Sequence, residues 1–572
     1  MSPVTEVELK FQVPASAWRA VEAAVARAAS QRTRLEAAYF DTPDWRLAAA
    51  GIALRLRKEG RRRVQTAKAA GADAMQRLEH NVPIGGRFGA AIDRLAGADP
   101  LRHAGTPVGE RLAAALAPRP DEAQAPTLVE QYRSVVWRRH RPLRVEGGVV
   151  ELALDRGELV AGGRREPVCE LEIELLRGDP RAVIATATRW VRRHGVWLDV
   201  RSKSERGVRL ARGIVRGPVV KASAVTLDRA MGADDALRAV IASCLRQILP
   251  NASEVAADAA AEAAHAGSAL RRTASDARAE TVAECETQSG EKNDAARDDG
   301  IAGHVHQLRV GLRRLRSALR FFDGWTTPLD AQAVESLTSL FRQLGAARDR
   351  DALAASLMPE LQAAGAPRFA LPAAPPGPTP GELVRAPAAT LALLSVLAFQ
   401  LDGAPPQSPA AAGEGVPDDA NAPQPTLAEA VSRRLERWHR RIVRSAQHYD
   451  TLSDDERHRL RKRVKRQRYA AEFVAALFPA GAVARYLAQL APLQEVLGHY
   501  NDVCVGLEMY RTAVGEDARA WFAIGWLTAR RDVLLADSAK ALARFSQSEP
   551  FWDKRVRRPK PKARDGGAMP GG

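Results

Sequence analysis

The chain has 572 residues, 46% hydrophobic and 27% charged, which is enough to bury more than one core and predicts two domains with linkers. Its 85 Lys and Arg residues exceed the 68 acidic ones, and the net charge of +17 favours a polyanionic partner such as nucleic acid, a membrane surface or a phosphate polymer. No basic leader and no apolar run of about 18 residues is found in the sequence, so we expect an intracellular protein without a membrane partner. The four cysteines suit a reducing cytosol and are too far apart for a local zinc motif: Cys169, Cys244, Cys285 and Cys504.

The first predicted strand, residues 6–11, alternates charged and apolar residues. Because successive side chains of a strand point to opposite faces, Glu6, Glu8 and Lys10 share one face. The two carboxylates would lie about 6 to 7 Å apart and repel each other unless a cation lies between them. A solvated sheet face would also explain one such strand, but the pattern returns in later strands.

The later strands up to about residue 212 carry charges of one kind on each polar face. An ordinary solvated face mixes residue types and would rarely place three glutamates side by side. If the sheet closes into a barrel, these faces line a charged lumen, in which acids hold a divalent cation and the basic groups bind phosphoryl oxygens. The basic residues are Arg55, Arg57, Lys68, Arg77, Lys203 and Arg206, and the acidic ones are Asp155, Glu170, Glu172 and Glu174.

Together these motifs resemble the CYTH domain, the triphosphate tunnel metalloenzyme family, over about residues 3–212. The resemblance implies an eight-stranded antiparallel tunnel that uses Mg²⁺ or Mn²⁺ to hydrolyse inorganic triphosphate; some relatives use thiamine triphosphate and a few cyclise ATP. It implies that Glu6, Glu8, Asp155, Glu170, Glu172 and Glu174 hold metal, and that Lys10, Arg55, Arg57, Lys68, Arg77, Lys203 and Arg206 bind substrate. Glu6, Glu8, Lys10, Arg55, Arg57 and Lys68 would be catalytic. Asn81 departs from the family pattern, which often has an acid there.

The second half is predicted to be all-helical, with a linker at 213–227, a domain over 228–550 and a basic disordered tail at 551–572. Residues of about 251–303 and 365–425 are poor in large apolar side chains or rich in Pro and Gly, and are expected to be mobile insertions, apart from a short helix at 388–400. A helix is predicted over 305–322. One stripe of it carries His306, Arg309, Arg313, Arg316 and Arg320.

The same spacing returns about 150 residues later in His458, Arg461, Lys465 and Arg468. About 40 residues after each basic helix comes a related segment, 344–349 with Arg348 and 497–502 with Asn501, which indicates an internal duplication. Like charges on one stripe repel each other, and an anion spanning the stripe would offset this cost.

This half resembles the CHAD domain, an all-helical family that binds inorganic polyphosphate, and the two resemblances together imply the architecture of bacterial CYTH-CHAD proteins. His306 and His458 could equally cap or pack a helix. The leading hypothesis is a cytoplasmic, metal-dependent inorganic triphosphatase whose helical module binds polyphosphate, with association to polyphosphate granules as a further expectation. A non-enzymatic polyphosphate scaffold and a thiamine triphosphatase or nucleotide-processing enzyme remain alternatives. A specific nucleic-acid binder is disfavoured because no reading motif is found, and the oligomeric state stays open.

Overall fold

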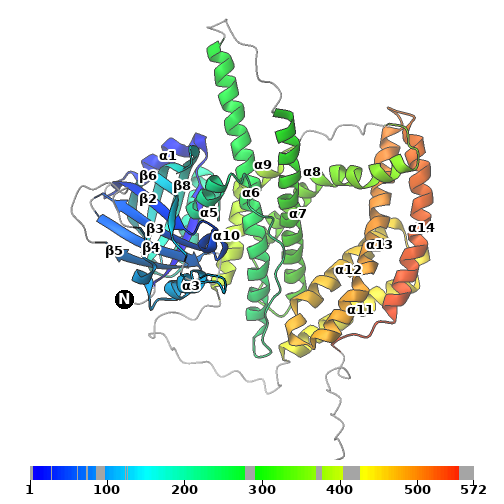
Figure 1. Cartoon of the computed structure of the whole chain (residues 1–572). Helices are drawn as coiled ribbons and strands as arrows, with labels where there is room; N and C mark the ends of the chain where they lie inside the picture. The colour runs from blue at the N-terminus through cyan, green and yellow to red at the C-terminus, as the bar shows by residue number, and fades with distance from the viewer. Residues whose placement is uncertain are drawn as a thin grey trace, which may run out of the picture.

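The computed structural model describes residues 4–27, 29–60, 62–71, 75–84, 97–122, 124, 126–276, 290–368, 377–402 and 426–552. Within these ranges the side chains of residues 4–5, 261–276, 290–299 and 346–356 lie outside the description. A closed β-barrel forms the N-terminal half and a helical assembly forms the C-terminal half (Figure 1). This confirms the predicted fold class, an antiparallel tunnel followed by an all-helical region.

The barrel is built from eight long strands in the described part of the chain, and each pairs with its neighbours in antiparallel fashion. The order runs β5-β4-β3-β2-β6-β7-β8-β1, and pairing of β1 with β5 closes the ring. A two-residue strand, β9 (Trp197–Leu198), extends β1. The strands are β1 (Val4–Gln12), β2 (Gln31–Asp41), β3 (Ile52–Glu59), β4 (Arg62–Ala70), β5 (Gln76–Pro83), β6 (Val129–Val145), β7 (Gly148–Ala161) and β8 (Arg164–Gly178).

Strict alternation along the strands determines which side chains enter the lumen. Leu9 and Phe11 of β1 are buried on the outer face, in a core that includes α4 (Arg181–His194), whereas the charged residues that alternate with them, Glu8 and Lys10, face inward. The outer face of β3 and β4 is covered by α2 (Arg46–Ala49) and α3 (Pro107–Ala115). The helix α5 (Lys203–Arg212) packs on β6 and β7, and its Leu210 contributes to a small core inside the barrel.

The helical half contains long helices that pack in neighbouring pairs. Two of them, α7 and α12, carry the basic stripes, and each is followed by a long helix, α8 or α13, that carries one of the two related segments. The helices are α6 (Ala233–Asp276), α7 (Gly290–Phe322), α8 (Ala331–Ala363), α9 (Pro380–Arg385), α10 (Pro387–Leu401), α11 (Leu427–Gln447), α12 (Asp454–Phe473), α13 (Ala480–Ala513) and α14 (Ala520–Ser546). Short helices α1 (Trp18–Val25), η1 (Ala15–Ala17), η3 (Pro100–His103), η4 (Tyr449–Thr451) and η5 (Ala475–Leu477) complete the described elements.

The structure differs from the expected insertion at 251–303 and confirms the short helix expected within 365–425. Residues 251–256 continue α6 and are buried, because small side chains suit a tightly packed helix pair as well as a linker. Residues 387–401 form α10, which is apolar on all sides and packs against α4, α6 and α8. Such a helix is stable only when surrounded by protein. The parts of the expected insertions at 277–289, 369–376 and 403–425, and the tail from 553 on, lie outside the described residues. The disordered tail was expected from residue 551, but Phe551 and Trp552 are buried in the core because their aromatic rings pack there.

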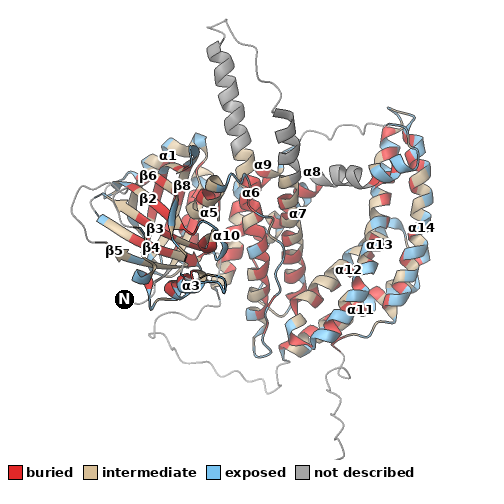
Figure 2. Cartoon of the chain, viewed as in Figure 1, coloured by how far each residue is buried: buried red, intermediate tan, exposed pale blue. Residues whose placement is uncertain are grey.

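One continuous apolar core joins the two halves. It runs from the outer face of β1, β7 and β8 through α4 and α10 into α6, α7, α12 and α13, and Figure 2 shows buried residues concentrated where α6, α7 and α10 meet. Arg181 of α4 also pairs with Asp402 at 2.9 Å. No helix in the described part of the chain is long and apolar enough to cross a membrane.

Candidate active site

Strand register places the predicted acids in adjacent positions on the lumen wall. Glu8 of β1 lies opposite Glu174 of β8, and Lys10 lies opposite Glu172. On the other side of β8, Asp155 of β7 lies opposite Glu170. Cross-strand neighbours are close enough to interact, so the lining forms acidic clusters. Each of two clusters contains one lysine.

The first cluster surrounds the Nζ atom of Lys203, which α5 brings into the barrel. This atom lies 2.7 Å from Asp155, 2.8 Å from Glu172 and in contact with Glu170. The three carboxylates can place oxygens within 4.8 Å of one another, a spacing at which they could share a metal ion. Burial alone would raise the pKa of Asp155, but Arg138 and Lys203 lower it below its usual value. Arg138 binds Asp155 through two hydrogen bonds of 2.7 Å.

The second cluster surrounds Lys68 of β4, which contacts Glu6 and lies 2.9 Å from Glu79 and 3.7 Å from Glu8. Here negative charge is in excess. Burial, together with the charges of Glu8 and Glu79, raises the pKa of Glu6 to about 9 against the opposing effect of Lys68. Burial and the charge of Glu8 raise the pKa of Glu174 to about 7, again against Lys68. Carboxylates with too few positively charged partners repel one another. They suit a divalent cation, because the cation takes oxygen ligands and its positive charge would remove this repulsion.

Arg55 and Arg57 of β3 supply positive charge to the lumen. Arg55 donates a hydrogen bond of 3.3 Å from Nη1 to the Tyr39 hydroxyl, and Arg57 pairs with Glu59. The Nε atom of each guanidinium is buried and has no hydrogen-bond partner in the described structure. Burial and the neighbouring cations Arg55 and Arg138 lower the pKa of Arg57 to about 10. Buried, incompletely paired guanidinium groups are suited to bind an anion.

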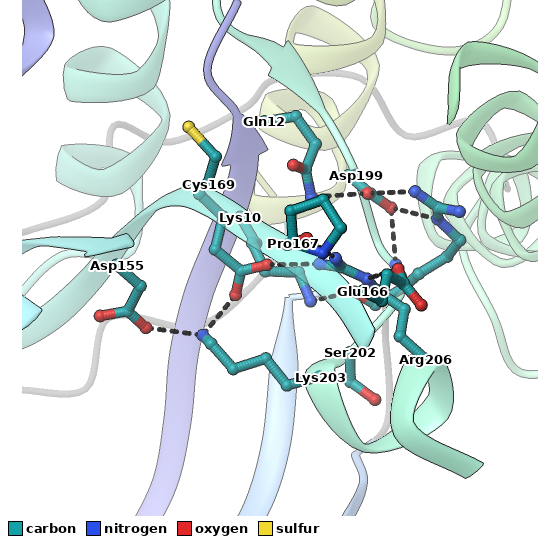
Figure 3. A network of polar contacts seen from close by, with 12 residues as sticks. Lys10, Gln12, Asp155, Glu166, Pro167, Cys169, Asp199, Ser202, Lys203 and Arg206 are labelled. Atoms are coloured by element: carbon teal, nitrogen blue, oxygen red, sulfur yellow. Dashed lines mark hydrogen bonds and ion pairs between the residues drawn. The ribbon is translucent and has the colours of Figure 1, made fainter. Parts of the chain in front are cut away.

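Three further predicted residues are engaged by the protein itself. Lys10 donates to the backbone oxygen of Arg201, and Arg77 donates to the oxygen of Gln76 at 3.0 Å. Arg206 binds Glu166 at 2.6 Å, Glu170 at 3.1 Å and the oxygen of Pro167 at 2.7 Å. Figure 3 shows Lys203 beside Asp155 and Arg206 within the same polar network. Arg206 therefore fixes the acidic wall in this structure.

A second candidate site is a cavity of about 1140 Å³ whose lining comes mainly from α7, α8 and α12. The cavity is called the basic groove here. Of the predicted polyphosphate ligands, it is lined by His306, Arg309, Arg313, Arg316, Arg320, His458, Arg461 and Lys465. Arg468 is absent from the lining and instead pairs with Glu472 at 2.8 Å. The side chain of Arg348 lies outside the described residues.

Aromatic and basic groups meet inside the groove. The guanidinium groups of Arg309, Arg313 and Arg316 lie 6.0, 5.4 and 4.9 Å from the centre of the Phe341 ring. Contact with the ring face partly stabilises this concentration of cations. His458 pairs with Asn501, one of the residues of the second related segment.

Sequence reasoning missed several lining residues. Arg138 lies in a run of arginines on β6, and only its register with Asp155 reveals that it faces the lumen. In the groove, the stripe chosen on α12 includes Arg468, whereas the structure turns Lys462 and Arg466 inward, together with Arg342 of α8. The buried face of α12 is marked by Leu460, Val464 and Gln467. Because Gln467 is polar, the sequence pattern did not reveal this face, and the residues that line the groove were assigned to the wrong stripe in part.

The fold and the lining define the class of the protein, an antiparallel tunnel with a charged lumen joined to a helical domain with a basic groove. The family model for the CYTH domain matches residues 5–207, and the model for the CHAD domain matches residues 282–511. The chain therefore belongs to the proteins that carry a CYTH domain followed by a CHAD domain, as the sequence motifs predicted.

Several solved structures resemble one half of the chain. The CHAD domain from the plant Ricinus communis is 24% identical, with a TM-score of 0.37, and the match covers 58% of this chain and 98% of that one. HpAC1 from Hippeastrum, which is described as having a dominant triphosphatase activity, is 16% identical with a TM-score of 0.25, over 36% and 96% of the two chains. The inorganic triphosphatase NE1496 is 20% identical with a TM-score of 0.14, over 31% and 77%.

Proposed function

We propose that the barrel hydrolyses inorganic triphosphate with the help of a divalent metal ion, Mg²⁺ or Mn²⁺, and that the basic groove binds inorganic polyphosphate. The observation that supports hydrolysis is the division of one lumen into two acidic clusters and an incompletely paired arginine group. A bound triphosphate needs both kinds of lining, because acids hold its metal ion while arginines bind its phosphate oxygens.

The chain's own residues divide the work as follows. Glu6, Glu8 and Glu174 would hold the cation, and Asp155, Glu170 and Glu172 offer a second set of oxygen ligands. The metal ion would supply Lewis acidity at phosphoryl oxygens. Arg55 and Arg57 would bind the phosphate chain, and the charge that moves onto the leaving phosphate would be stabilised by Lys68 and Lys203.

The test is phosphate release by the full chain from triphosphate, with Mg²⁺ or Mn²⁺ and with excess chelator. We expect turnover only with metal, and we expect Glu6→Gln to reduce kcat at least a hundredfold, because a ligand of the electrophile is lost. Glu158→Gln is the matched control, since Glu158 points out of the same barrel and pairs with Arg165 on the surface. Full activity in chelator, or equal rates for both variants, would refute the proposal. Thiamine triphosphate and ATP in the same assay compare the alternative substrates.

Polyphosphate binding is supported by the composition of the groove. Its lining brings together seven arginines and two lysines against two aspartates, Asp323 and Asp502. A flexible chain of phosphates can follow such a curved, concentrated row of cations, whereas a duplex keeps a fixed phosphate spacing. The seven arginines are Arg309, Arg313, Arg316, Arg320, Arg342, Arg461 and Arg466, and the lysines are Lys462 and Lys465.

A further inference from the structure

The helix α6 of the helical half, which precedes the residues matched by the CHAD model, reaches the wall of the tunnel through Glu254. This carboxylate is 5% exposed and lies between two arginines of the barrel domain. It contacts Arg209 on the second turn of α5 and lies 3.9 Å from Nη1 of Arg201 in the loop before α5. The adjacent Ser253 accepts a hydrogen bond of 3.0 Å from the backbone N–H of Val200 in that loop. Glu254 and Ser253 therefore hold both the loop and the helix that follows it.

The segment held in this way carries lumen cations. Lys203 is the first residue of α5 and reaches the acidic cluster with Asp155 and Glu172. Lys10 donates to the backbone oxygen of Arg201, so the position of the loop also fixes the position of Lys10. A shift of α5 along its axis would displace both ammonium groups.

The barrel itself holds the start of α5 through Arg206, which bonds Glu166 and Glu170 of β8, and holds the preceding loop through Asp199. Asp199 is fully buried and binds Arg201 through hydrogen bonds of 3.0 and 2.8 Å, and Gln12 of β1 donates to Asp199 at 2.9 Å. These contacts fix the beginning of the loop. The last turns of α5 have Glu254 as the buried partner of Arg209, whose other partner, Glu205, is exposed.

We propose that Glu254 of α6, in the helical half, is a positioning residue for the tunnel, which holds α5 so that Lys203 and Lys10 keep the geometry that triphosphate requires. This inference rests on the proposed function. It makes the helical domain part of the hydrolytic site, although none of its residues lines the lumen in the described structure. A displacement of about 1 Å is enough to reduce the rate of a preorganised reaction by about a hundredfold.

The same helix also contacts the wall of the groove. Gln247 and Asn251 lie two turns and one turn before Glu254. Gln247 donates to Gln307 of α7 at 2.8 Å and accepts from Arg314 at 3.2 Å, and Asn251 pairs with His304 at 2.9 Å. The polar face of α6 thus holds α7, which carries part of the lining of the basic groove, and α5, which carries Lys203.

The test compares three variants of the full chain. Glu254→Gln removes the charge that holds α5, Glu254→Asp keeps the charge, and Asp258→Asn is the matched control. Asp258 lies one turn further along α6 and pairs with Arg216, which follows α5, so its loss removes an ion pair of the same kind without releasing α5. The measurements are kcat and KM for triphosphate, polyphosphate binding, and hydrogen exchange of the α5 amides.

We expect Glu254→Gln to lower kcat/KM about tenfold or more and to speed exchange in α5, with polyphosphate affinity unchanged. Glu254→Asp should recover part of the activity, and Asp258→Asn should match the wild type in kcat/KM even if both variants lose the same stability. Equal activity of Glu254→Gln and Asp258→Asn would overturn the inference. An inactive wild-type chain would instead refute the proposed triphosphatase, and exchange in α5 would still show whether Glu254 holds this helix.

Discussion

At the scale of single residues, Lys465 is the groove cation whose charge changes near neutral pH. Burial, together with Arg461 of its own helix and Arg309 and Arg313 of α7, lowers its pKa to about 7 against the opposing effect of Asp502 of α13. A bound polyanion favours the charged ammonium and would raise this pKa again. Binding should therefore take up a proton.

We predict that polyphosphate affinity rises as pH falls from about 9 to 7 and then levels off, because Lys465 is already charged in the free protein below its pKa. Calorimetric titrations in two buffers of different ionisation enthalpy would measure the proton uptake. Lys465→Arg is the control, since a guanidinium remains charged across this range, and its affinity should lose the pH dependence. His458 titrates outside this window because burial lowers its pKa below the usual value. The same pH dependence in both proteins would contradict the assignment.

Which residues the sequence could predict depends on how each is positioned. The tunnel acids were predictable because alternation along a strand fixes the face of Glu6, Glu8 and Glu172 without any knowledge of the partner strand. Arg138 was not, because its inward direction follows from its register with Asp155, and register depends on the closed ring. The role of Arg206 as a partner of Glu166 also needs the folded packing of α5.

At the scale of elements, the basic stripe of α7 is a rigid array. Its arginines project from a helix packed against α6 and α12, so they lose little conformational freedom when an anion binds. The aromatic ring of Phe341 further restricts three of them. An array of this kind binds more tightly than the same number of mobile surface charges.

We predict that changing Arg309, Arg313 and Arg316 to Ala weakens polyphosphate binding on the order of 10- to 100-fold and reduces its salt dependence, because fewer counterions are released. The matched control changes three exposed arginines of α11 that do not line the groove, Arg433, Arg437 and Arg441. Both variants carry the same net charge, so titrations at two salt concentrations separate the groove from general attraction. Equal losses of polyphosphate affinity in the two variants would show that the groove binds no better than any other basic surface.

The extension of α6 beyond residue 250 contradicts the expected insertion, whereas α10 confirms the short helix expected at 388–400, and the two helices have one physical feature in common. A long run of alanines in α6 and an apolar helix between Pro-rich segments in α10 lack the amphipathic periodicity that marks a surface helix. Both become stable through tertiary packing, since α6 pairs with α7 along much of its length and α10 is surrounded by α4, α6 and α8. Local composition alone does not carry that information.

At the scale of the whole molecule, one continuous apolar core is shared by the barrel and the helices, from which we expect them to unfold together. Leu394 of α10 is 1% exposed within that core. We predict one calorimetric unfolding transition for the wild type, and a loss of about 2 to 5 kcal/mol in the free energy of unfolding for Leu394→Ala, because a cavity opens between the halves. Leu101→Ala, at a residue that is 80% exposed, should leave stability unchanged. Two separate wild-type transitions would show that the halves unfold independently.

The closure of the barrel also dictates when the site can come into existence during protein synthesis. Glu8 belongs to the first strand of the chain and Glu174 to the eighth, and their pairing completes the acidic wall. The ribosome synthesises the chain from its N-terminus, so one edge of β1 stays unpaired until β8 has been synthesised. During that interval the charged face of β1, with Glu6, Glu8 and Lys10, keeps the unpaired strand soluble and discourages pairing with other chains. The carboxylates that we propose as metal ligands in the folded barrel would thus also oppose aggregation of the nascent chain.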